Sequence, residues 1–83
     1  MLNWHEVKNY DTNLMGWANR DNGVDIPEIG MTVLLIFPEP SDGRIYEGRF
    51  KEATISNSAG FYGKDFDWTM INGVKWAIYN RPD

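Results

Sequence analysis

Few side chains in this sequence have the chemistry that catalysis needs. His5 is the sole histidine, so general-base chemistry through an imidazole would have to use it. Serines stand at Ser41, Ser56 and Ser58, but none lies in the G-x-S-x-G pattern that exposes a nucleophile on a strand-to-helix turn. A surface or half-buried histidine is the simpler interpretation of His5. We therefore expect no catalytic residues and no enzymatic activity.

Carboxylates are the other candidates for chemistry. Asp65 and Asp67, with Glu6 or Asp25, could offer oxygens to Mg²⁺ or to a glycosidic bond. A spacing of two also suits the solvated outer face of a strand. Residues 21–25 (DNGVD) resemble part of a calcium loop, but the full ligand run and its closing glutamate are missing, so a turn is the better interpretation. The chain has no cysteine, and we expect no metal site and no cofactor.

Residues 60–64 (GFYGK) raise the question of nucleic-acid binding. They partly resemble the aromatic RNA-binding strand, but the leading basic position is Ala59 and the later positions do not fit. Twelve acidic against eight basic residues give the chain a net charge of −4, which opposes contact with phosphates. We expect no direct nucleic-acid binding. The cations that could still form a local basic strip are Arg44, Arg49, Lys51 and Lys64.

The elements that would position these residues are mostly strands. Eighty-three residues with 42% hydrophobic composition suit a single domain, residues 1–83. Alternating and apolar runs predict strands near 32–37, 44–55, 66–71 and 74–79, with a bulge near Glu52. Since 32–37 is apolar on both faces, it should be a central strand that ends at the following prolines. We expect a mainly β (or α+β) fold, a small antiparallel meander curled into a barrel or roll.

Two turns matter most to this prediction. Asn72-Gly73 is the strongest short-range hairpin signal and should join 66–71 directly to 74–79. In the first third, Asp11 or Thr12 could cap a short helix, while Asp21-Asn22-Gly23 offers a competing hairpin turn. The sequence leaves helix and hairpin open.

Three segments resemble a known family. Trp4-His5-Glu6-Val7 is similar to its opening W-x-x-V. Residues 26–34 (IPEIGMTVL) are similar to its L-P-x-x-G-x-x-V-L segment, and 73–78 (GVKWAI) with Pro82 to its closing G-V-T-H-W-M-P-L-P. The family consists of small phage and prophage proteins catalogued as domain of unknown function 551. The resemblance implies a phage or mobile-element origin and a mainly β fold, and it supplies no catalytic residues.

The departures from this family are informative. Residues 8–25 form an insertion relative to it. Val74-Lys75 stand where the family has a threonine-histidine pair, so no role of that histidine carries over. Ile78 replaces the proline after the closing tryptophan segment.

We expect a non-catalytic accessory protein that binds a host or phage protein in the cytoplasm of the host cell. No apolar run approaches the roughly 20 residues of a membrane span, so a membrane is not expected as a partner, and exposed strand edges allow a homodimer. The insertion offers residue types that are enriched at interface centres. The predicted protein-binding residues are Tyr10, Leu14, Met15, Trp17, Asp21 and Asp25. The apolar ones could instead cap the open end of the barrel.

The alternative function is inhibition of a host nucleic-acid-binding defence enzyme by mimicry of nucleic acid. Residues 1–40 hold six acidic and two basic residues, so the acidity lies in the first half of the chain. An acidic face can occupy a cationic groove that otherwise attracts phosphates. The carboxylates concerned are those of Glu6, Asp11, Asp21, Asp25 and Glu28.

Overall fold

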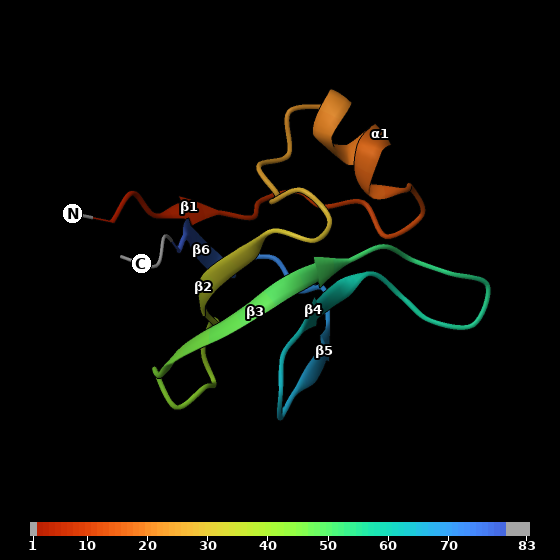
Figure 1. The fold of residues 1–83 in the computed structure, drawn as a ribbon. Helices are drawn as coiled ribbons and strands as arrows, with labels where there is room; N and C mark the ends of the chain where they lie inside the picture. Colours follow the sequence, from red (N-terminus) through yellow and green to blue (C-terminus); the bar gives the residue numbers. More distant parts are fainter. Residues whose placement is uncertain (1, 80–83) are drawn as a thin grey trace.

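The computed structural model describes residues 2–79, which form an antiparallel six-stranded sheet and one short helix (Figure 1). The strands lie in the order β1-β6-β2-β3-β4-β5. The predicted mainly β fold is confirmed, and the first third contains a helix rather than a hairpin. Pro82 of the family resemblance lies outside the described residues. The elements are β1 (His5–Glu6), α1 (Gly16–Asp21), β2 (Thr32–Ile36), β3 (Ile45–Lys51), β4 (Gly60–Tyr62), β5 (Asp67–Thr69) and β6 (Lys75–Ile78).

The sheet is open. Its two outermost strands, β1 and β5, pair only with β6 and β4 respectively, so the predicted closure into a barrel is wrong. Both edge strands are short, with two and three residues, and neither offers a ladder long enough to close the sheet. Among residues 2–79 no helix has the length and apolar character to cross a lipid bilayer.

The prediction of a central strand is confirmed by β2. It lies between β6 and β3 and pairs with both. Val33 and Leu35 are fully buried on its inner face, while Thr32, Leu34 and Ile36 are half-buried on the other. The inner face packs on the core, and side chains of the two neighbouring strands partly cover the outer face.

The predicted hairpin at Asn72-Gly73 is wrong. Strand β5 pairs with β4, whereas β6 lies on the far side of β2. Gly73 does make a turn with φ of +102°, but the turn carries the chain across the sheet. There the N–H of Gly73 donates to the carbonyl of Val7 at 2.8 Å, and the N–H of Val7 donates to Val74 at 2.9 Å. A positive φ suits any tight turn and does not require a hairpin.

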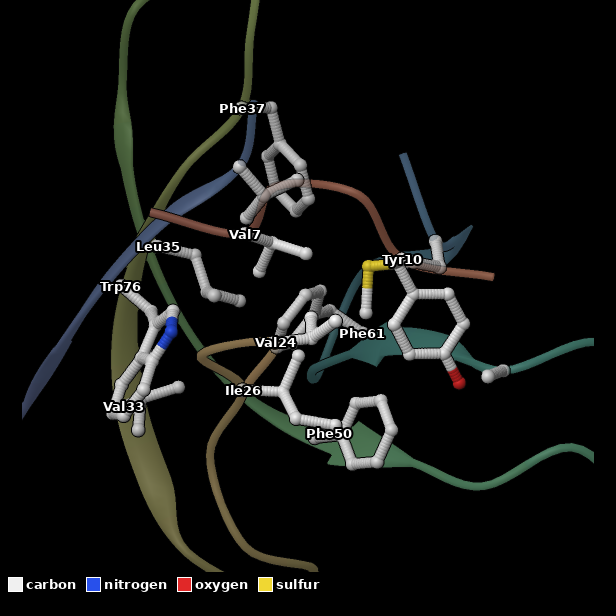
Figure 2. Packing of buried hydrophobic residues seen from close by; sticks show 13 residues of the cluster. Val7, Tyr10, Val24, Ile26, Val33, Leu35, Phe37, Phe50, Phe61 and Trp76 are labelled. Carbon is white, nitrogen blue, oxygen red and sulfur yellow. The ribbon is translucent and has the colours of Figure 1, made fainter. Parts of the chain in front are cut away.

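The core lies on one face of the sheet, beneath an irregular cover from the first third of the chain (Figure 2). Val7 and Tyr10 enter it from the segment after β1, and Val24 and Ile26 from the segment after α1. The sheet contributes mainly aromatic and branched side chains. The buried cluster comprises Val7, Tyr10, Val24, Ile26, Val33, Leu35, Phe37, Phe50, Ala59, Phe61, Met70, Val74 and Trp76.

One end of the core is an aromatic cluster that depends on two glycines. The ring of Phe66 packs edge-on against Phe37, with centroids 5.7 Å apart. A Cβ at Gly48 would lie 2.8 Å from the Phe66 ring, and one at Gly63 would lie 2.3 Å from it. Both positions therefore need glycine for Phe66 to pack, and Phe37 in turn contacts Trp68 of β5 at 4.3 Å between centroids.

Replacing Gly60 with alanine should weaken the attachment of β5. A Cβ at this position would lie 1.9 Å from the carbonyl oxygen of Trp68 on the neighbouring strand, so the backbone must move. We expect Gly60→Ala to lower the free energy of unfolding by about 1–3 kcal/mol, measured by urea denaturation. The control is Ser58→Ala, an exposed loop substitution that should change stability by less than about 0.5 kcal/mol. Equal stability of the two variants would contradict the close packing of β4 on β5.

Candidate functional site

The start of α1 is held by the residue that directly follows strand β3. Glu52 follows β3, and its Oε1 accepts a hydrogen bond of 2.8 Å from the N–H of Gly16. Met15 occupies the N-cap position and makes no side-chain capping bond. The predicted caps at Asp11 or Thr12 are therefore wrong, and the predicted bulge near Glu52 is wrong as well. The strand ends at Lys51, which frees the next carboxylate to satisfy an exposed helix donor.

Asn19 ties the helix to the segment that precedes it. It is 1% exposed, and its Oδ1 accepts the N–H of Asp11 at 2.8 Å. Its Nδ2 donates to the carbonyls of Asp11 and Met15, each at 3.1 Å. A buried amide with this many partners fixes the path of residues 11–15 relative to α1.

The other end of α1 is closed by the Asp21-Asn22-Gly23 turn. Gly23 has a φ of +90°. The N–H of Gly23 donates to the carbonyl of Arg20, and the N–H of Val24 donates to the carbonyl of Asn19, both at 3.0 Å. These two bonds are the Schellman arrangement of a helix C-terminus. The turn thus ends a helix, and it returns Val24 to the core.

The structure separates the predicted protein-binding residues. Trp17 and Met15 are exposed, at 63% and 42%, and lie on either side of buried Gly16; we call them the helix-start surface. Tyr10 is a core residue, and Leu14 is half-buried beside a small cavity that Tyr10 also lines. Both therefore fit the alternative interpretation of a cap on the sheet.

Asp21 and Asp25, the two acidic residues among the predicted protein-binding residues, have different surroundings. Asp21 is exposed at the last position of α1. Asp25 is exposed too, but its Oδ2 lies 2.7 Å from Nδ1 of His5.

The contacts of His5 join separate segments of the fold. Its ring stacks on Trp76 with centroids 4.2 Å apart and planes 13° from parallel. Trp76 Nε1 donates to the carbonyl of Asp25 at 3.0 Å, so the three residues connect β1 and β6 to the segment after α1. Within residues 2–79 no serine hydroxyl bonds to His5, and Ser41 Oγ donates instead to the carbonyl of Phe37.

The carboxylates that could bind a metal are dispersed. Asp67 forms an ion pair with Lys51, and Asp65 lies outside the strands. In the part of the chain that the structure describes, no group of three or more histidine, aspartate or glutamate side chains could hold a metal ion.

An open groove lies on the outer face of the sheet, away from the buried core. Arg49 pairs in register with Thr32 on β2 and with Tyr62 on β4, and its Nε donates to Thr32 Oγ1 at 3.3 Å. The groove has a volume of about 730 Å³. Its lining is Thr32, Glu47, Gly48, Arg49, Tyr62, Gly63, Lys64 and Tyr79.

The structure divides the basic strip of the sequence. Lys51 is paired with Asp67, and Arg44 lies 3.7 Å from Asp42. Arg49 and Lys64 line the groove, and neither forms an ion pair with a carboxylate of residues 2–79. These four cations are recognisable in the sequence, but the sequence does not show which of them form ion pairs.

Comparison of the chain with protein-family models, with curated proteins and with solved structures finds no match. The resemblance to the phage family stays a prediction.

Removing the Glu52 carboxylate should loosen α1. Glu52→Ala leaves the N–H of Gly16 without its acceptor, and we expect a loss of about 1 kcal/mol in the free energy of unfolding, the usual effect of a lost helix cap. Glu52→Gln keeps an oxygen acceptor and should lose less. Urea denaturation followed by circular dichroism measures both. An equal loss in the two variants would show that charge, and not the hydrogen bond, holds the helix.

Replacing Tyr10 with phenylalanine should not destabilise the fold. The Tyr10 hydroxyl is buried and has no hydrogen-bond partner among the described residues. We expect Tyr10→Phe to retain the stability of the natural protein or to add about 1 kcal/mol at neutral pH, measured by urea denaturation. A clear loss would show that the hydroxyl is bonded in solution.

The same variant should change the response to alkaline pH. Burial, followed by the Glu52 charge, raises the pKa of Tyr10 above its ordinary value of 10.0. The fold therefore favours the neutral phenol, and the stability that this provides is complete below pH 10 and is lost as the pH rises through the folded-state pKa. We expect the natural protein to lose more stability than Tyr10→Phe above pH 10.

Proposed function

We propose that the protein is a non-catalytic protein-binding module that docks on a host or phage protein through the helix-start surface. The observation that supports the proposal most directly is the 63% exposure of Trp17 on a helix anchored at both ends. Tryptophan and methionine are enriched at the centres of protein interfaces, and tryptophan often carries much of the binding energy there. The phage context rests on the family resemblance.

The anchoring of α1 supports this role. Glu52 holds the start of the helix, Asn19 holds the preceding segment, and the turn at Gly23 holds its end. A side chain presented from a fixed backbone loses less conformational freedom on binding than one on a loose loop. The six-residue helix is too short to be stable by itself, so these contacts are what make Trp17 a defined feature of the surface.

The alternative, mimicry of nucleic acid, has weaker support. Among the five carboxylates it requires, Asp25 contacts His5 and Asp11 accepts the N–H of Asn13. Glu6 stands opposite Lys75 in the β1–β6 pair, where opposite charges attract. A cationic groove would have to compete with these local partners. Among residues 2–79, no ion pair or hydrogen bond involves the side chains of the helix-start surface.

Charge substitution at the helix-start surface tests the proposal. We expect the double variant Met15→Lys with Trp17→Lys to lose the protein captured by the natural chain from infected host lysate. Its melting temperature should be unchanged, because both side chains are exposed. The matched control is Ile45→Lys, an equally apolar site that is 56% exposed at the start of β3, far from α1 in Figure 1. This variant should keep the partner.

A conservative substitution at the same position serves as a second control. Trp17→Tyr retains an aromatic ring and should retain most of the binding. If the double variant still captures the partner, the proposal is wrong. Capture that weakens steeply with salt in the natural protein would favour the acidic alternative instead.

A further inference from the structure

We propose that the outer-face groove binds a small phosphorylated molecule with a flat ring, of the nucleoside mono- or diphosphate class. The proposal is independent of the protein-binding role of α1. The groove opens on the exposed side of β2, β3 and β4, whereas the cover that carries α1 packs on the buried side.

A row of side chains across three strands forms the middle of the groove. The register aligns Thr32, Arg49 and Tyr62 as direct neighbours. Neighbouring strands lie about 4.8 Å apart, so this row spans roughly 10 Å, the scale of a nucleoside. Tyr79 continues the row beyond Thr32, because the preceding residue, Ile78, pairs with Val33. A tyrosine therefore lines each side of the groove, and a flat ring can stack on an exposed aromatic face.

Two cationic side chains form the phosphate-binding end of the proposed site. Arg49 is oriented by its bond to Thr32 Oγ1, and Lys64 lines the same groove two residues after Tyr62. Neither forms an ion pair within residues 2–79. Guanidinium and ammonium groups bind phosphate oxygens through charge-assisted hydrogen bonds.

Size and charge restrict the occupant to a small ligand. The groove volume of about 730 Å³ lies in the range of small-molecule sites, roughly 300–1,000 Å³. The chain carries a net charge of −4. A long polyanion would meet this repulsion along its whole length, whereas one or two phosphate groups can contact Arg49 and Lys64 alone.

Titration with adenosine diphosphate, adenosine and pyrophosphate tests the site. With backbone amide resonances as the readout, we expect adenosine diphosphate to shift signals of β3 and of residues 62–64, and to bind more tightly than either fragment. Arg49→Gln should weaken binding of adenosine diphosphate about tenfold, the effect of one charge-assisted contact. The matched control, Arg44→Gln, removes an exposed arginine that pairs with Asp42 outside the groove and should leave binding unchanged.

A second variant separates the ring from the phosphate. Tyr62→Leu should weaken the binding of adenosine diphosphate but not that of pyrophosphate, since only adenosine diphosphate has a ring that can stack. Thermal unfolding checks that each variant is folded. Absence of shifts at millimolar adenosine diphosphate would overturn the proposal. So would tighter binding of a twelve-nucleotide single strand than of adenosine diphosphate, because that result would identify a polymer as the occupant.

Discussion

Three hydrogen bonds between residues 7–10 and 72–74 are the constraint on which the fold depends. Two of them join the backbone of Val7 to that of Gly73 and Val74, and the third runs from the N–H of Tyr10 to Asn72 Oδ1 at 2.9 Å. They hold the start of the chain beside β6 and bring the side chains of Val7 and Tyr10 into the core. Without this connection the meander of β2 to β5 would have one apolar face open to water.

The sequence predicts the central strand well and the long-range connections poorly. Strand β2 is recognisable because its apolar residues occupy both faces, a local property. Asn72-Gly73 indicates a turn correctly, but the destination of the chain depends on Val7, more than sixty residues away. Glu52 illustrates the same limit. The change of apolar phase near Glu52 suggests a bulge, whereas the Glu52 carboxylate caps a helix 36 residues earlier in the chain.

Among the predicted protein-binding residues, side chains of similar type lie in different environments. Met15 and Trp17 lie on the surface, as an interface requires, but Tyr10 has the same kind of side chain and belongs to the core. Residue type alone cannot separate them, since aromatic side chains serve both purposes. The groove shows a related limit: that Arg49 lies between Thr32 and Tyr62 is a property of strand register, which no local pattern specifies.

The two surfaces differ in how binding would affect the domain. The segments flanking α1 supply Tyr10 and Val24 to the core, so a partner that clamps the helix-start surface also secures the cover over the sheet. By linkage, such a partner stabilises the fold by an amount set by its concentration relative to its dissociation constant. The groove lies on strands that are already paired on both sides, so a ligand there fixes side chains and leaves the cover unchanged. Hydrogen exchange at residues 7–26 should therefore slow with a helix partner and not with a groove ligand.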